Sequence, residues 1–166
     1  INVNHIANLA NASVIKEFRK YCPEGLIGPS FAYGPIYAKS EHPEDVLAME
    51  NALELSNYLW MDVYARGEYS PLHINLLKKI GITLDLTEED KLLLKGSTPD
   101  FMGVNYYQST TVTTKERKHE ENIELSNTVQ SKAESFPTDS LFVTCKNDYA
   151  KYTDWGWTID PIGLQV

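Results

Sequence analysis

The sequence is poor in the residues that make disulfide frameworks and metal sites. Cysteine occurs only at Cys22 and Cys145, which lie far apart with no His or Cys at metal-ligand spacing. We therefore expect reduced thiols in a cytoplasmic protein. The 4 histidines show no metal-ligand spacing either, so neither a metal nor any other cofactor is predicted.

Positive charge and long apolar runs are also scarce. Lys and Arg number 15 against 23 Asp and Glu, and the net charge of −8 argues against nucleic acid and anionic membranes as partners. No apolar run approaches the length of a membrane span, and we expect no signal peptide. What remains is ordinary for a soluble globular protein, with 42% hydrophobic and 23% charged residues.

Neither end of the sequence resembles a natural terminus. The first residue is Ile1 rather than Met, and the last residues, GLQV, carry no charged tail. We therefore expect residues 1–166 to be a single segment from the middle of a longer protein, to which the function belongs.

The apolar spacing predicts four helices. Apolar residues at helical spacing predict a helix over 3–21 and another from Pro43 to about Tyr64, which stops near Gly67. Further helices are predicted over 71–79 and over 88–95. The second helix has Glu44 and Asp45 in its first turn, where acids suit the helix dipole, and His42 is a candidate cap. Thr87 and Asp90 form a capping box before the last helix.

Two short apolar stretches predict strands. Residues 26–33 and 101–107 are too short for helices, and we expect the first strand to be buried on both faces. Two strands joined by a helical crossover predict a parallel β-α-β unit. Residues 108–150 are polar, and they predict a strand extension or hairpin near 108–115 followed by a long loop.

The second strand changes character along its length. Because side chains alternate, Met102, Val104 and Tyr106 share one face, which we expect to pack under helices. Gly103, Asn105 and Tyr107 share the other face. Its polar end is either a strand leaving the core at the surface or the lining of a site. Both a β/α barrel and an open α/β sheet place ligands at such strand ends, so the pattern alone does not choose between them.

Five stretches in order resemble glycoside hydrolase family 1. DFMGVNYYQS (100–109) resembles the sixth-strand motif of the family, and TDWGWTIDPIGL (153–164) resembles its T-D-x-G-W-x-I-x-P-x-G-L motif. The other three, in the same order as in the family, are NLANASVIKEFRK, IGPSFAYGPIYAKSEHPEDVLAMENA and YLWMDVYARGEYSP. The resemblance implies a partial (β/α)8 TIM barrel, roughly strands five and six with their helices and a long loop.

The resemblance also implies retaining hydrolysis of β-glucosides. Retention needs two carboxylates about 5 Å apart, one acid/base and one nucleophile. The family's motifs for them, T-[FL]-N-E-P and [IV]-T-E-N-G, are absent from this sequence. We therefore expect both catalytic carboxylates to lie outside the chain, and the chain alone to be inactive.

The residues that the resemblance carries over support catalysis rather than perform it. Asn105 and Tyr107 match the active-site Asn and Tyr of the family, in which the Tyr hydroxyl bonds the nucleophilic carboxylate. Such a donor keeps the carboxylate ionised. Trp157 matches a Trp at the aglycone end of the cleft, and Tyr33 is either a substrate contact or structural. His5 matches a helix position with a packing or hydrogen-bonding role.

One departure from the family pattern bears on the substrate. Where many members have Asn on the fifth strand, this chain has Ala32, and its A-Y-x-P-x-Y pattern resembles the bacterial 6-phospho-β-glucosidase branch. The expected ligand is then a small β-glucoside or a phosphorylated disaccharide. The phosphate-binding loop of that branch lies outside this chain.

Alternatives to the glycosidase remain open from the sequence. One is a non-catalytic carbohydrate-binding or interaction α/β module, and another is an unrelated open α/β domain complete in itself. A segment with two or three barrel strands also cannot close a barrel, so we expect self-association through open strand edges.

Overall fold

The computed structural model describes residues 2–120 and 137–166, and these fall into two compact units. The first unit takes the described residues within 1–32 and 56–105, and the second takes those within 33–55 and 106–166. The chain therefore passes through each unit twice. None of the helices in the described ranges has the length and hydropathy of a membrane span.

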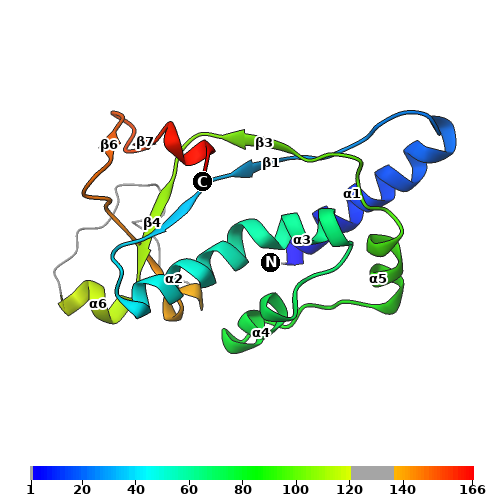
Figure 1. The fold of residues 1–166 in the computed structure, drawn as a ribbon. Coiled ribbons are helices and arrows are strands. Elements are labelled where there is room, and N and C mark those ends of the chain that lie inside the picture. The colour runs from blue at the N-terminus through cyan, green and yellow to red at the C-terminus, as the bar shows by residue number, and fades with distance from the viewer. Residues whose placement is uncertain (1, 121–136) are drawn as a thin grey trace. The chain divides into compact units, whose positions relative to one another are not determined.

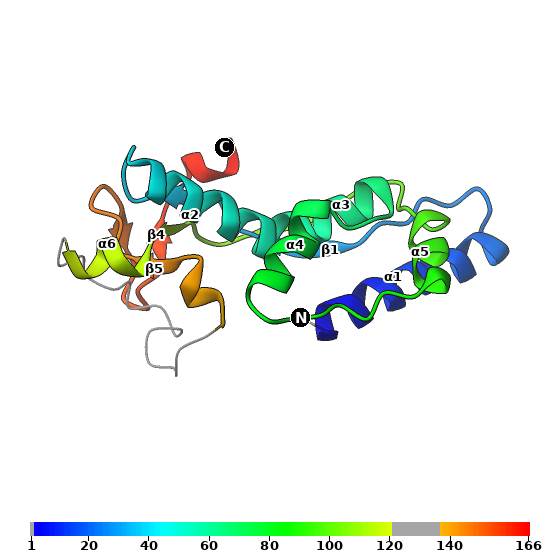
Figure 2. The ribbon, with the colours of Figure 1, turned by 90° about the horizontal axis from the view of Figure 1, so that it is seen from below.

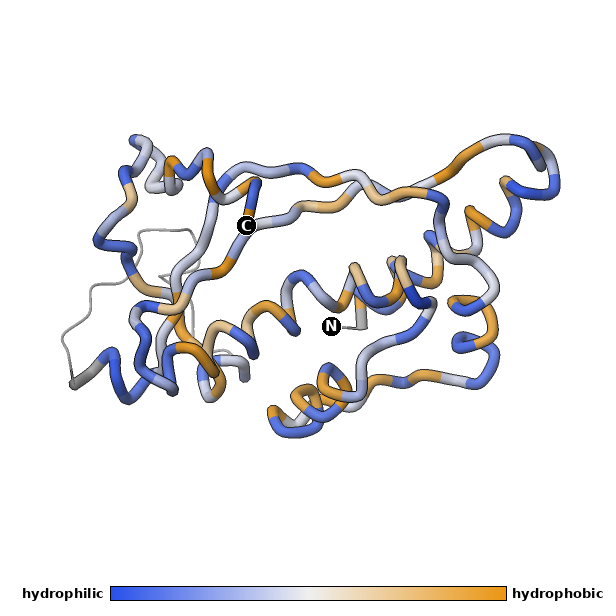
Figure 3. Tube along the Cα trace, viewed as in Figure 1, coloured by the Kyte–Doolittle hydropathy of each residue, from blue (hydrophilic) through white to orange (hydrophobic). Residues whose placement is uncertain are grey.

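The first unit contains four helices and most of a two-stranded sheet (Figure 1). Its elements are α1 (Asn2–Tyr21), β1 (Ser30–Tyr33), α3 (Leu59–Arg66), α4 (Pro71–Lys79), α5 (Glu88–Lys95) and β3 (Gly103–Tyr106). β1 and β3 are hydrogen-bonded neighbours. Hydrophobic and hydrophilic residues alternate along α1 and α4 in Figure 3, as in amphipathic helices that bury one side. Ile15 of α1 and Leu77 of α4 are almost fully buried.

The helices of this unit end and begin where the local sequence predicts. Thr87 accepts a hydrogen bond from the Asp90 N–H at 3.1 Å while the Asp90 carboxylate accepts from the Thr87 N–H at 2.9 Å, which confirms the capping box. α3 ends at Gly67, whose φ of +69° lies in the left-handed region. His5 of α1 bonds the hydroxyl of Tyr69 through Nδ1 at 3.1 Å, so its hydrogen-bonding role is confirmed.

The second unit is built on a mixed sheet. Its elements are β2 (Ile36–Ala38), α2 (Pro43–Leu53), β4 (Thr110–Thr113), α6 (Lys115–Glu120), the 3-10 helix η3 (Pro137–Ser140), β5 (Val143–Cys145), β6 (Lys151–Tyr152), β7 (Thr158–Ile159) and the 3-10 helix η4 (Ile162–Leu164). β2 and β4 pair in parallel, and β4 and β5 pair antiparallel. A parallel pairing across helices is thus present between β2 and β4, which follow in the chain the two stretches, 26–33 and 101–107, for which the crossover was predicted. Ala48 and Ala52 of α2 pack with Val112 of β4, and Figure 2 shows α2 beside these strands.

α2 begins at its predicted position but differs at its other end. The His42 ring accepts a hydrogen bond from the Glu44 N–H at 3.3 Å, which confirms His42 as the cap. The helix predicted to continue to about Tyr64 is interrupted by a π-helical segment, Glu54–Tyr58, before α3. Apolar spacing over so few residues does not distinguish a single π-helical turn from α-helix, so the interruption could not be predicted.

Asp45, in the first turn of α2, does more than face the helix dipole. Its carboxylate is fully buried, and Oδ1 accepts hydrogen bonds from Thr113 Oγ1 at 2.6 Å and from Arg117 Nε at 3.0 Å. Ser40 Oγ donates to Oδ2 at 2.5 Å. Burial opposes ionisation of Asp45, but the hydrogen bonds from these three side chains and the Arg117 charge lower its pKa below 3.8. α2, β4 and α6 are therefore joined by a buried ion pair.

The predicted burial of the strands is wrong. In the stretch 26–33, Phe31 is buried against Tyr64, with ring centroids 5.8 Å apart, but Leu26, Ser30 and Ala32 are exposed. Met102 and Val104 are exposed as well, rather than packed under helices. Within the described part of this unit, Tyr64 of α3 packs on Phe31, on one face of the short sheet. An apolar sequence predicts that a strand can be buried, but not on how many faces other elements cover it.

The polar stretch 108–150 has more structure than predicted. It contains β4, α6, η3 and β5, while residues 121–136 of the expected loop lie outside the described residues. β4 and β5 pair antiparallel, with Thr111 opposite Cys145. A strand extension or hairpin was expected near 108–115, and β4 confirms a strand there, in a different sheet from β3.

Candidate active site

Asn105, near the end of β3, is held by its neighbouring strand in the first unit. Its Nδ2 donates a hydrogen bond to Ser30 Oγ at 3.0 Å. The segments that precede β1 and β3 approach closely at Gly28, where an added Cβ would collide with the backbone of Phe101. The hydrogen bond to Ser30 orients the amide of Asn105, which remains exposed.

The start of the DFMGVNYYQS motif is tied to β1 by its aspartate. Asp100 Oδ2 accepts a hydrogen bond from the Ile27 N–H at 2.9 Å, and the Asp100 N–H donates to the Ile27 carbonyl at the same distance. Arg19 of α1 donates to Asp100 Oδ1 at 3.0 Å. Asp100 therefore sets the position of β3, on which Asn105 lies.

Tyr107 and Trp157 lie together in the second unit. Their ring centroids are 6.1 Å apart with planes inclined by 56°, an arrangement typical of favourable aromatic pairs. Tyr107 is 65% exposed and Trp157 is 43% exposed. A phenol hydroxyl and an indole face are thus both available to a ligand.

A tight hairpin presents Trp157 beside Tyr107. β6 and β7 pair antiparallel, the Thr153 N–H donates to the Trp157 carbonyl at 2.9 Å, and Gly156 has φ +80°. The hairpin is fastened by Thr158, whose Oγ1 accepts from the Ser109 N–H at 2.9 Å and donates to the Ser109 carbonyl at 2.7 Å. Because Ser109 follows Tyr107 by two residues, these bonds place both aromatic rings.

Tyr33 lies near two other phenols, those of Tyr37 and Tyr106. Tyr37 donates a hydrogen bond to Asp160 Oδ2 at 2.9 Å, and Tyr106 donates to the Asp160 carbonyl. Burial, the Asp160 hydrogen bond and the neighbouring Asp160 and tyrosine groups, Tyr33 included, raise the pKa of Tyr37 to about 12. The phenol therefore stays neutral and donates.

Asp160 itself stays ionised. Burial opposes its ionisation, but hydrogen bonds from Ser109, Tyr37 and the N–H groups of Gly163 and Ile162 outweigh burial and lower its pKa. Gly163 is required here because a side chain would collide with the hydroxyl of Tyr106. Tyr106 was expected to face helices, whereas its hydroxyl reaches the segment before η4.

Tyr37, Ser109, Thr158 and Asp160 lie within the motifs quoted from the sequence but were not predicted as site residues. One signal was present for Asp160, because an Asp directly before Pro161 and a short helix is a typical capping pattern. No signal was present for the Thr158–Ser109 pair, which lies 49 residues apart in the sequence. In the described ranges, His, Cys, Asp and Glu form no group of three or more that could hold a metal.

Comparison with known proteins decides the family. The model of Glycosyl hydrolase family 1 matches residues 1–166. This chain belongs to glycosyl hydrolase family 1. The family resemblance predicted from the ordered motifs is thereby confirmed.

Curated relatives of this family 1 chain include enzymes acting on phosphorylated glucosides. It is 46% identical to the aryl-phospho-β-D-glucosidase BglC of Bacillus subtilis over 98% of the chain and 34% of that relative. It is 31% identical to the 6-phospho-β-glucosidase AscB of Escherichia coli, again over 98% of the chain and 31% of that relative. The chain thus spans about a third of the length of these relatives.

Solved structures share the fold of this family 1 chain. The psychrophilic β-glucosidase BglU from Micrococcus antarcticus matches 98% of the chain and 34% of that structure, with TM-score 0.76 and 22% identity. The β-glucosidase from Exiguobacterium antarcticum B7 matches 97% of the chain and 32% of that structure, with TM-score 0.73 and 25% identity. The α/β class predicted from the sequence is confirmed.

Proposed function

We propose that this chain is part of a retaining β-glycosidase that hydrolyses 6-phospho-β-glucosides. The observation that carries the proposal is the 46% identity, over 98% of this chain, to an aryl-phospho-β-D-glucosidase. The match to a 6-phospho-β-glucosidase at 31% identity supports the same substrate class. A non-catalytic carbohydrate-binding or interaction module is not favoured by these relatives.

The proposed architecture is a (β/α)8 barrel in which this chain supplies roughly strands five and six. The parallel pairing of β2 with β4 across a helical crossover supports this placement. The TM-scores of 0.76 and 0.73 against family 1 enzymes agree with it. In a barrel of this kind, active-site residues lie at the strand ends, where Asn105 and Tyr107 are found.

The proposed role of Tyr107 is to donate a hydrogen bond to the nucleophilic carboxylate, which another segment of the protein supplies. A donor to the charged form lowers the pKa of a carboxylate and fixes its orientation for attack on the anomeric carbon. The exposure of Tyr107, 65%, leaves its hydroxyl accessible for this contact. Asn105 is proposed to support the same nucleophile.

Trp157 is proposed to bind the aglycone. Its indole is partly exposed and inclined to the Tyr107 ring, so a flat aglycone can pack on it while the sugar faces the phenol. Tyr33 is proposed as a contact at the substrate end of β1. We further propose a cytoplasmic location, which the free thiols of Cys22 and Cys145 support.

The proposal is tested by comparing substrates on the longer protein that contains this sequence. We expect a higher kcat/KM for nitrophenyl β-glucoside 6-phosphate than for nitrophenyl β-glucoside, and no turnover by residues 1–166 alone. Higher kcat/KM for the unphosphorylated glucoside would overturn the substrate class. Turnover by the isolated chain would overturn the location of the carboxylates outside it.

A further inference from the structure

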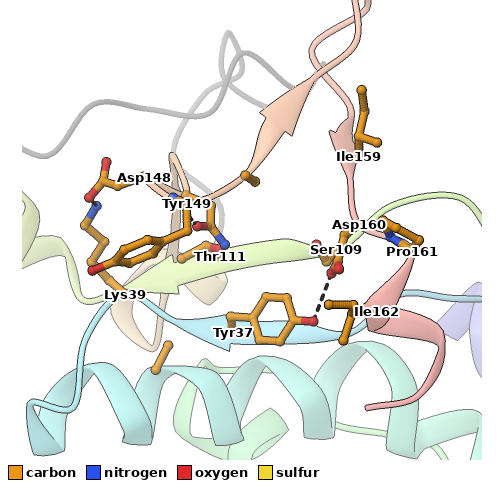
Figure 4. A pocket seen from close by; sticks show the side chains of 13 residues that line it. Tyr37, Lys39, Ser109, Thr111, Asp148, Tyr149, Ile159, Asp160, Pro161 and Ile162 are labelled. Atoms are coloured by element: carbon orange, nitrogen blue, oxygen red, sulfur yellow. Dashed lines mark hydrogen bonds and ion pairs between the residues drawn. The ribbon is translucent and has the colours of Figure 1, made fainter.

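A pocket of about 480 Å³ lies in the second unit, between the ends of β2 and β4 and the turn that follows β5 (Figure 4). This volume is in the range of small-molecule sites. Its walls include Tyr37, Lys39, Thr111, Asp148, Tyr149 and Asp160. The pocket uses neither Asn105, Tyr107 nor Trp157, so its argument is independent of the proposed hydrolysis.

Thr111 provides a polar group in this pocket that has no hydrogen-bond partner. The side chain is 4% exposed, and Oγ1 is buried without a partner among the described residues. Its neighbour Val112 packs against α2, and alternation along β4 directs the two side chains differently. A buried hydroxyl without a partner costs free energy, which a ligand in the pocket would recover.

The turn that carries Tyr149 is held by hydrogen bonds within the chain. The Tyr149 N–H donates to Asn147 Oδ1 at 2.9 Å, and the Asn147 N–H donates to the Tyr152 hydroxyl at 2.7 Å. Lys39 on the far side pairs with Asp148 and donates to the Lys146 carbonyl at 3.4 Å. The Tyr149 side chain is 97% exposed, so its ring lies at the rim of the pocket with a free face.

The charges of the lining select among ligand classes. Lys39 is the positive group, and Asp148 and Asp160 are negative, so these three ionised side chains sum to −1. Because the pKa of Tyr37 is raised to about 12, its phenol is neutral and adds no charge to the lining. A phosphate or carboxylate ligand would be repelled, and Lys39 is already paired with Asp148.

We propose that this pocket binds a neutral saccharide, with the pyranose ring against Tyr149 and a hydroxyl bonded to Thr111 Oγ1. A sugar offers hydroxyls that both donate and accept, which suits a lining of hydroxyls, carboxylates and an amide. It also has a C–H face that packs on an aromatic ring, as the exposed Tyr149 requires.

The test is a titration of the ¹⁵N-labelled longer protein that contains this sequence with cellobiose, followed by NMR. We expect saturable shifts of the Thr111 and Tyr149 amides at millimolar sugar. Thr111→Val and Tyr149→Ala each weaken binding at least tenfold, while Thr111→Ser, which keeps the hydroxyl, binds as the parent chain does. Matched controls are Thr83→Val and Tyr21→Ala, at exposed positions away from the pocket.

A second titration, with glucose 6-phosphate, tests the effect of negative charge on the ligand. We expect it to bind more weakly than glucose, because of the net negative lining. The proposal would be overturned if the Thr111 and Tyr149 amides did not shift up to the solubility limit of cellobiose. It would also be overturned if Thr111→Val bound cellobiose as tightly as the parent. Tighter binding of glucose 6-phosphate than glucose would overturn it as well. The spectrum of each variant shows directly whether it is folded.

Discussion

At the residue scale, Asn105 and Tyr107 stand two positions apart in one motif but are positioned by different contacts. Asn105 is oriented by Ser30 of the neighbouring strand, at 3.0 Å. Tyr107 is placed through Ser109, which Thr158 binds from the hairpin that also carries Trp157. A substitution at Thr158 therefore bears on Tyr107, although Thr158 matches no catalytic motif.

Removing the Tyr107 hydroxyl tests its proposed role. We expect Tyr107→Phe in the longer protein to lower kcat about ten- to a hundredfold, the rate equivalent of losing a hydrogen bond to a charged group. The acid limb of the kcat/KM profile should move to higher pH, because the nucleophile loses a donor to its ionised form. Tyr21→Phe, on the exposed end of α1, is the control. An unchanged pH profile would contradict a contact with the nucleophile.

At the element scale, α2 and the hairpin β6–β7 are each joined to a neighbouring strand or segment by side-chain hydrogen bonds. Asp45 joins α2 to β4 and α6 through Thr113 and Arg117. Thr158 joins β7 to the segment before β4. Short strands of two to four residues hold few ladder bonds, so such side-chain contacts decide how firmly the elements are placed.

The buried ion pair of Asp45 predicts an acid-sensitive stability. Asp45→Asn leaves the Arg117 charge without its carboxylate, and we expect a loss of about 3–5 kcal/mol in the free energy of unfolding. Glu44→Gln, the same change on an exposed neighbour, should cost less than about 0.5 kcal/mol. Urea unfolding of both variants measures the difference.

The pH dependence of the same pair follows from its pKa. Because the folded-state pKa of Asp45 lies below its ordinary value of 3.8, the stabilisation is complete above pH 3.8. It is lost as the pH falls through the folded pKa. We expect the unfolding free energy of the parent chain to drop across this acidic range, and that of Asp45→Asn to drop less. Equal slopes for the two would refute the linkage.

The hairpin turn can be tested through Gly156. Its φ of +80° makes Gly156→Ala unfavourable by about 1 kcal/mol, and Gly81→Ala, at φ +77°, is a matched control in the first unit. We expect similar losses of stability from both. Only Gly156→Ala should alter tryptophan fluorescence and raise KM for aryl glucosides, because it moves Trp157. Equal effects on KM would argue against aglycone binding at Trp157.

At the scale of the whole molecule, exposed apolar side chains remain along the short sheet β1–β3. Phe101, Met102 and Val104 are exposed beside a sheet with only two strands. Apolar strands with open edges pair readily with other chains. The chain also spans only about a third of the length of its curated relatives.

We therefore expect the isolated chain 1–166 to self-associate. Light scattering should show a mass above the monomer's 18.8 kDa, rising with concentration. Val104→Lys, which places a charge on the strand, should return the chain toward monomer, while Val3→Lys on exposed α1 should not. A monomer at every concentration would rule out association through these strands.

Features that depend on neighbouring residues could be predicted from the sequence alone. The capping box of Thr87 and Asp90, the His42 cap, the stop at Gly67 and the strand at 103–106 all follow from local chemistry. The ordered motifs likewise determined the family. Such contacts close within a few residues, so a pattern can reveal them.

Which faces are covered and which polar groups meet could not be predicted from the sequence and became visible in the folded chain. The burial of Asp45 against Arg117, the fastening of Ser109 by Thr158 and the meeting of Tyr37 with Asp160 join residues 49 to 123 positions apart. The exposure of Val104 has the same origin, since an apolar residue is buried only where another layer covers it. Long-range packing sets these contacts, and local propensity carries no record of it.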